Sequence, residues 1–370
     1  MKDSQGQVLT GATVEAVALY DTAVRAATLG YGDAMGGFEA ARETAPAFVM
    51  AHLGKAWLFV FARDPAMDSQ IASLMEAAKA LPMNEREQAH FAALRHASAG
   101  ALAPAVEVLD IHVMRYPFDV LAHLMVAFLD QFQGRIRWVR DRPARALPLW
   151  PKDLPGYGTM LAIHGFGLEE MGEYTRADDE SRAALEIDPH NTIAHHTVAH
   201  VLEMTGRAED GLGWMQAREA FWATTDSQLQ GHIGWHRALF HLELGQYEAA
   251  LALHDGPMRT TQRPMARRLT DPSSLLWRLA ALGYDVSDRW SAVAHMWEGH
   301  ADGRCFRCRR HFIDPDRPAI RAALSRPSPS CAALRQVLSA LCLRRKAAAG
   351  AGKRLGVVEL LTSAGGEHVE

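Results

Sequence analysis

The segment GEYTRADDESRAALEIDPHNTIAHHTVAHVLEMTG, residues 172–206, begins and ends on a glycine and contains two stretches with helical apolar spacing. Asp188-Pro189 separates the two stretches, and proline disfavours helix in the residue before it. Each glycine follows an apolar stretch and stands before a polar turn. The segment therefore predicts one helical hairpin, with helices over about 174–187 and 190–205.

Glycines recur in this position along the chain, at intervals of 34, 38, 34, 39 and 38 residues: Gly100, Gly134, Gly172, Gly206, Gly245 and Gly283. A period in this range is typical of stacked helical hairpins, each of which buries its apolar face only against its neighbours. We therefore predict an all-α fold, a tetratricopeptide-like α-solenoid of about five to seven irregular hairpins. Because solenoids share a fold without sharing a function, the function must come from the concave surface.

Apolar residues at helical spacing also predict the other helices of the chain. Asn84-Glu-Arg-Glu87 has the pattern of a capping box at a helix start. The glycine cluster 30–37 is expected to be flexible, and the proline-rich stretch 135–157 to hold one short helix and a loop. The remaining expected helices are 14–30, 38–62, 68–81, 85–99, 101–116, 119–133, 158–171, 208–223, 228–244, 247–254, 273–282 and 287–299.

The composition of the chain narrows the kinds of partner that the protein is expected to bind. The chain has 370 residues, of which 48% are hydrophobic and 22% charged, and its net charge of −4 favours neither nucleic acid nor an anionic membrane as a partner. The first residues contain no apolar signal core, and no run approaches the roughly 18 apolar residues of a membrane span. We expect a cytoplasmic protein that binds neither a membrane nor nucleic acid.

The last part of the chain differs in character from the rest. All four cysteines lie there, and residues 304–370 carry 13 Lys and Arg against 5 Asp and Glu, whereas residues 1–303 carry 26 against 38. We predict a helical-repeat domain over 1–303 and hypothesise that the tail 304–370 is a frame-shifted or disordered terminus. The alternative is a small zinc module, although only its first pair has ribbon spacing: Cys305, Cys308, Cys331 and Cys342.

Histidine and glutamate converge in the segment 160–254, which holds 9 of the 18 histidines. Three predicted helices end with Leu-Glu before a turn glycine, and the glutamates are Glu169, Glu203 and Glu243. His196 and His236 each precede their Glu by seven residues, two helical turns, and so share its face. His196 with His200, and His232 with His236, are spaced i, i+4 on one face. His164 lies five residues before Glu169, still near that face.

First helices of successive hairpins line the inner groove of a solenoid, so these side chains are expected to meet there. Imidazoles spaced i, i+4 and carboxylates from adjacent helices are how helical bundles build metal sites. The predicted metal ligands are His196, His200, His232 and His236, with zinc or iron as the metal. A His–Glu proton-transfer pair is an equal alternative. In the third interpretation, the histidines fill interhelical space with their nitrogens hydrogen-bonded.

Two further residue types complete the predicted site. Trp235, beside His236, is expected at the wall of the groove, while most other tryptophans are expected in the core. Arg207 is expected either to pair with the glutamates or to hold an anionic ligand. The body of the chain has no cysteine nucleophile and no Gly-x-Ser-x-Gly elbow.

Several motifs together resemble the tetratricopeptide repeat protein 38 family over about residues 14–306. They are HGFGLEE (164–170), AHHTVAHVLEM (194–204) with Gly206-Arg207, and HIGWHRALFHLELG (232–245). Supporting matches are Asp119-Val-Leu-Ala122, Arg140-Asp-Arg142 with Leu147-Pro148, and Phe48-Val-Met-Ala-His52. The resemblance implies a cytosolic helical-repeat protein and assigns it no activity. It stops near Arg304, where the tail begins.

Two functions follow from the sequence. The first is a module that binds a peptide or a small ligand in the groove, the usual role of such arrays. The ligand-binding residues would be His164, Glu169, His196, His200, Glu203, Arg207, His232, Trp235, His236 and Glu243. The second is a metal-dependent enzyme that acts on a small substrate through the same histidines and glutamates.

Overall fold

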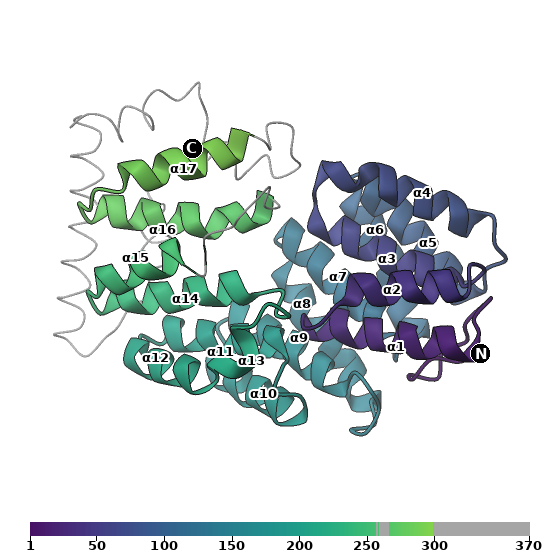
Figure 1. The fold of residues 1–370 in the computed structure, drawn as a ribbon. Helices are drawn as coiled ribbons and strands as arrows, with labels where there is room; N and C mark the ends of the chain where they lie inside the picture. The colour runs from purple at the N-terminus through teal and green to yellow at the C-terminus, as the bar shows by residue number, and fades with distance from the viewer. Residues whose placement is uncertain (257, 259–265, 299–370) are drawn as a thin grey trace, which may run out of the picture. The chain divides into compact units, whose positions relative to one another are not determined.

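The computed structural model describes residues 1–256, 258 and 266–298, and over these residues the chain is all-α and contains no strand, as predicted (Figure 1). The chain divides into two compact units. The first comprises residues 1–198 and 220–230, and the second comprises 199–219 and the described residues from 231 onward. The tail 304–370 lies outside the described residues, as do its four cysteines, so the frame-shift and zinc-module hypotheses stay predictions.

Consecutive helices pack against each other along the first unit, so that each hairpin covers the next. Short 3₁₀ turns at Pro65–Met67 and Leu147–Leu149 interrupt the series. The α-helices are α1 (Val14–Leu29), α2 (Ala34–Thr44), α3 (Val49–Ala62), α4 (Asp68–Lys79), α5 (Glu85–Ser98), α6 (Leu102–Arg115), α7 (Val120–Gln133), α8 (Ile136–Ala146), α9 (Tyr157–Glu170) and α10 (Tyr174–Ile187).

One continuous helix, α11 (Thr192–Met204), runs across the division between the units, which falls after Val198. In the second unit α15 packs on α16 and α16 packs on α17. The helices that follow α11 are α12 (Ala208–Ala217), α13 (Glu219–Trp222), α14 (Gln230–Glu243), α15 (Tyr247–Asp255), the 3₁₀ turn η3 (Ala266–Leu269), α16 (Thr270–Ala281) and α17 (Ser287–Glu298). The stretch predicted as one helix over 208–223 is therefore two helices.

The six periodic glycines stand where the helices end. All six have φ between +69° and +93°, in the left-handed region that favours glycine. Gly134, for example, donates its N–H to the carbonyls of the last turn of α7. The glycine period therefore marks helix C-termini, and the predicted hairpin repeat is confirmed.

The stretch 38–62, predicted to be helical, is interrupted in the structure. Two helices occupy the region, because the chain leaves the helix at Ala45 and turns at Pro46 before α3 begins. The glycine cluster is also partly helical. Asp33 accepts a hydrogen bond from Gly36 N at 2.8 Å and so caps α2. Gly37 then packs so close to Ala23 of α1 that a side chain there would collide with it.

A side-chain link recurs at three helix starts of the first unit. In each case a histidine six residues after a proline donates from Nε2 to the proline's carbonyl oxygen. The distances are 2.9 Å for His52 to Pro46, 3.0 Å for His123 to Pro117 and 2.8 Å for His195 to Pro189. All three histidines follow an alanine and are buried. The link satisfies a loop carbonyl that the helix itself leaves without a partner.

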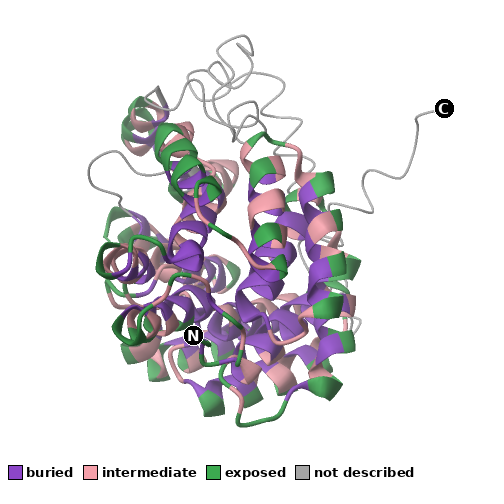
Figure 2. Ribbon diagram, turned by 90° about the vertical axis from the view of Figure 1, so that its right-hand side faces the viewer, coloured by how far each residue is buried: buried purple, intermediate pink, exposed green. Residues whose placement is uncertain are grey.

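Each unit has its own apolar core. The first is built mostly from small and aromatic side chains of α1 to α9, and the second from α14 to α17 around Leu275, Leu279 and Trp297. Individual helices are amphipathic, with buried and exposed residues on opposite sides (Figure 2). Among the helices described, none is both long enough and apolar enough to cross a bilayer.

Candidate functional site

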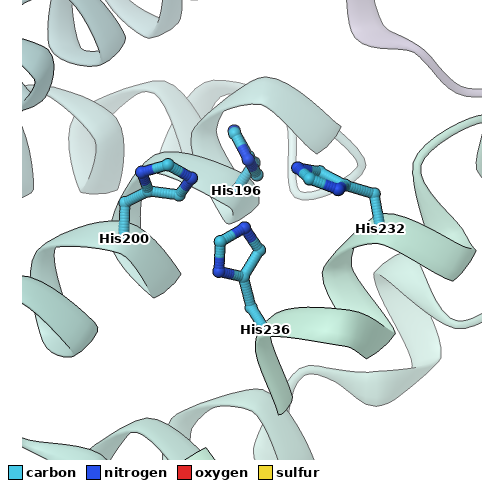
Figure 3. Close-up of side chains that lie close together, drawn as sticks. All are labelled: His196, His200, His232 and His236. Atoms are coloured by element: carbon cyan, nitrogen blue, oxygen red, sulfur yellow. The ribbon is translucent and has the colours of Figure 1, made fainter. Parts of the chain in front are cut away.

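Four histidines from two helices point into one space (Figure 3). His196 and His200 lie one turn apart on α11, and His232 and His236 lie one turn apart on α14. One nitrogen from each of the four rings lies within 4.8 Å of the others. The i, i+4 spacing explains the arrangement, because it places both rings of a pair on the same side of their helix.

Within the second unit, the rings of three of these histidines contact one another. The ring centroids of His200 and His236 are 4.5 Å apart, and those of His232 and His236 are 5.0 Å apart. His236 is the central member of the three and is only 1% exposed. His196 precedes His200 on the same helix and is itself buried.

A carboxylate fixes the orientation of His236. Its Nδ1 lies 3.0 Å from Glu203 Oε2, at the end of α11. Because an ionised carboxylate only accepts, Nδ1 carries the proton and Nε2 carries the ring's lone pair. Burial lowers the pKa of His236 well below its usual range, and the neighbouring histidines and Arg278 act in the same direction. The imidazole is therefore neutral at physiological pH, the form that binds metals.

His232 repeats this arrangement with a different carboxylate. Its Nδ1 lies 2.9 Å from Asp271 Oδ2, in the first turn of α16. The carboxylate again accepts the proton that Nδ1 carries. Metal-binding histidines in proteins commonly donate their second nitrogen to a carboxylate in this way. Asp271 was not among the residues predicted from the sequence, because no spacing relates α16 to α14.

An arginine and a tryptophan lie beside the histidines. Trp235 is half-buried and stacks on His232, with ring centroids 5.6 Å apart and planes 12° apart. The guanidinium carbon of Arg278, on α16, lies 5.4 Å from the centre of the Trp235 ring. Burial lowers the pKa of Arg278, while the charges of Glu203 and Asp271 raise it. Trp235 thus stands next to the histidines, and its predicted place at the wall of a groove stays a prediction; Arg278 was not among the predicted residues.

The structure also describes the remaining predicted residues, each in its own surroundings. His164 faces α10, where its Nδ1 lies 2.5 Å from Glu180 Oε2, and Glu169 is buried near the end of α9. Arg207 is exposed and donates to Asp210 at 2.8 Å, one turn along its own chain segment. Glu243 is exposed at the end of α14. Glu203 is hydrogen-bonded to His236, one of the histidines of Figure 3.

A second group of ionisable side chains, not predicted from the sequence, is buried in the first unit. Asp119 Oδ2 accepts from Arg86 Nε at 2.6 Å, from His90 Nε2 at 2.9 Å and from His112 Nε2 at 3.0 Å. Burial opposes ionisation of Asp119, but the charge of Arg86 and these hydrogen bonds hold its pKa well below the usual range.

We call Asp119, Arg86, His90 and His112 together the Asp119 hub. Its contacts hold helices together and do not fit a metal ion. Trp57 Nε1 donates to His90 Nδ1 at 3.0 Å, so both nitrogens of that ring are engaged. The second Asp119 oxygen accepts from Ala122 N and caps α7. The hub joins α5, α6 and α7, and no sequence spacing could show that three helices bring these residues together.

Comparisons with known proteins add little to this picture. No family model matches the chain, so the resemblance to the tetratricopeptide repeat protein 38 family stays a prediction. A solved structure of MamA AMB-1 is similar at 18% sequence identity and a TM-score of 0.32, covering 46% of this chain and 88% of that one. The fold described above therefore rests on the helices themselves.

Proposed function

We propose that this protein binds one transition-metal ion, zinc or iron(II), through His196, His200, His232 and His236. The observation that carries the proposal is the convergence of four imidazoles, with nitrogens within 4.8 Å of one another. Around a zinc ion with bonds of about 2.0–2.1 Å, four ligand nitrogens stand roughly 3.4 Å apart. Small inward rotations of the rings would bring the nitrogens to that spacing.

The protonation of the site supports the same proposal. His232 and His236 each have Nδ1 bonded to a carboxylate, as metal-binding histidines in proteins commonly do. Glu203 and Asp271 also supply two negative charges against the two positive charges of the ion.

The test uses the full chain, stripped with a chelator and reloaded with Zn²⁺ or, without oxygen, with Fe²⁺. We expect one metal per chain by mass spectrometry of the metal content. His232→Ala and His236→Ala should each reduce that content strongly. His241→Ala is the matched control: it removes a histidine of the same helix whose Nδ1 contacts Gln246 instead. Equal metal content in all three variants, or none in the wild type, would refute the site.

A second candidate function is enzymatic, and the Glu203–His236 pair is the observation that favours it. A buried neutral imidazole oriented by a carboxylate is the arrangement of a general base. In this form of the proposal His236 would be the base and not a metal ligand, and a metal held by the other three histidines would supply an activated water, the usual basis of metal-assisted hydrolysis. The test is hydrolysis of p-nitrophenyl acetate and bis(p-nitrophenyl) phosphate by the metal-loaded chain. Metal-dependent turnover that Glu203→Gln abolishes would support an enzyme, and its absence for both esters would favour a binding protein.

The predicted peptide or small-molecule ligand belongs to the same proposal. Trp235 offers a half-exposed ring beside the histidines, and tryptophan is a frequent anchor of bound ligands. In this form of the proposal the metal holds the ligand and Trp235 contacts its apolar part.

A further inference from the structure

We infer that the ligand of the metal site is a small oxyanion, a carboxylate or a phosphate, bound between the metal and Arg278. This inference rests on the proposed metal site and names the ligand class that it would take. It begins from the unusual position of Arg278, which is half-buried on α16 beside the histidines.

Arg278 makes no ion pair with any residue in the described ranges. Its Nη1 donates to both oxygens of Ser274, the backbone oxygen at 3.2 Å, and its guanidinium lies over the Trp235 ring. These contacts leave the edge formed by Nε and Nη2, which is the edge that binds a carboxylate or phosphate in two parallel hydrogen bonds. A half-buried guanidinium with this edge available is a binding group for an anion.

The charges around the histidines lead to the same ligand. Without a metal, the two carboxylates and the guanidinium beside the histidines, Glu203, Asp271 and Arg278, together carry one negative charge. A divalent ion changes that sum to one positive charge in a half-buried space. A monovalent oxyanion would neutralise it, by coordinating the metal with one oxygen and accepting from Arg278 with another. The anion should therefore bind much better to the metal-loaded protein than to the metal-free protein.

The coupling between metal binding and anion binding can be measured in the unaltered protein, because each must affect the other equally. If the metal strengthens anion binding, then the anion must strengthen metal binding by the same factor. The probes are acetate and inorganic phosphate, each at constant ionic strength against chloride. Zinc affinity is measured by competition with a chromophoric chelator, with a protein-free control for complexes of zinc with the anion. The comparison between the two anions identifies which of them the site prefers.

Arg278→Gln separates the role of the arginine from that of the metal. We expect this variant to keep one metal per chain and to lose roughly 10- to 100-fold in affinity for the anion, the effect of one charge-assisted pair. Arg278→Lys keeps the positive charge but loses the edge that donates two parallel hydrogen bonds. Its affinity for the anion should lie between those of the wild type and Arg278→Gln. Arg289→Gln is the matched control, because Arg289 is bonded to Asp255 elsewhere in the second unit.

The outcomes distinguish the two proposals. If the wild type binds no metal, the proposed function fails. If it binds metal but acetate and phosphate leave the zinc affinity unchanged, or if Arg278→Gln and Arg289→Gln have equal anion affinities, the anion inference alone fails. Should Arg278→Gln not fold, the wild-type coupling and Arg278→Lys still decide the question.

Discussion

Glu203 and His236 lie on different helices, α11 and α14, yet the carboxylate of the first is 3.0 Å from the imidazole Nδ1 of the second. The glutamate is one turn beyond His200 on its helix, so α11 supplies both a histidine and the carboxylate that orients a histidine of its neighbour. Because an oriented imidazole presents a defined lone pair, this contact bears directly on metal affinity.

Glu203→Gln is expected to weaken zinc binding by about 10- to 100-fold, the usual effect of losing a carboxylate behind a metal ligand. The amide oxygen can still accept a hydrogen bond from His236 Nδ1. The loss of zinc affinity would therefore reflect the missing negative charge of the carboxylate and the lower basicity of the His236 ring. Competition with a chromophoric chelator measures it. Glu248→Gln, an exposed glutamate of α15, is the control. An unchanged affinity for Glu203→Gln would argue that this carboxylate has only a packing role.

Gly167 allows α8 to approach α9. A Cβ at this position would lie 2.5 Å from the backbone N and Cα of Arg140, and backbone atoms cannot rotate away. Gly167→Ala should therefore destabilise the protein by roughly 1–3 kcal/mol. Gly213→Ala, in α12 with no atom near its Cβ direction, should instead stabilise by about 0.5–1 kcal/mol. Thermal unfolding followed by circular dichroism compares the two. Melting shifts of the same sign would contradict this account of Gly167.

The Asp119 hub should be a main source of stability in the first unit. Asp119→Asn removes the nearer of the two carboxylates, Asp119 and Asp3, that compensate the buried Arg86 guanidinium, and we expect a loss of roughly 3–5 kcal/mol in the free energy of unfolding. Glu76→Gln, an exposed carboxylate of α4, should change it by less than about 0.5 kcal/mol. Urea denaturation measures both. A loss below about 1 kcal/mol for Asp119→Asn would mean that the hub adds little.

Acid should destabilise the protein through His123. Burial lowers the pKa of His123 to about 4, partly offset by its bond to the Pro117 carbonyl. The unfolded chain takes up this proton below pH about 6.5 and the native chain only below about 4, so stability falls as the pH drops through this window. The loss reaches roughly 3 kcal/mol at the lower end.

The measurement is urea denaturation of the wild type and of His123→Gln at pH 7, 6, 5 and 4. The variant keeps a donor for the Pro117 carbonyl but cannot titrate, so its stability should depend less on pH. His96→Gln, at a half-exposed position in α5, should behave as the wild type. Identical pH dependence in all three proteins would show that His123 does not contribute.

Local rules predicted most of the helices because they act within a few residues. The capping box at Asn84 is present with both of its hydrogen bonds, and the periodic glycines have the backbone angles that end helices. In the region 38–62 the apolar spacing continues across Pro46, so periodicity alone does not show where α2 ends and α3 begins. The repeated proline–histidine link was visible as a spacing of six residues, but only the hydrogen bonds at His52, His123 and His195 explain it.

The sequence by itself determined which residues share a helical face. His196, His200 and Glu203 share the face of one helix, and His232 and His236 share the face of another. This was possible because the rise and turn of an α-helix relate positions three, four and seven apart without reference to the rest of the molecule. The tertiary structure alone decided that Asp271 and Arg278 join the histidines and that Asp119 gathers Arg86, His90 and His112. Such contacts depend on how one helix packs on another, which the periodicity of a single helix does not contain.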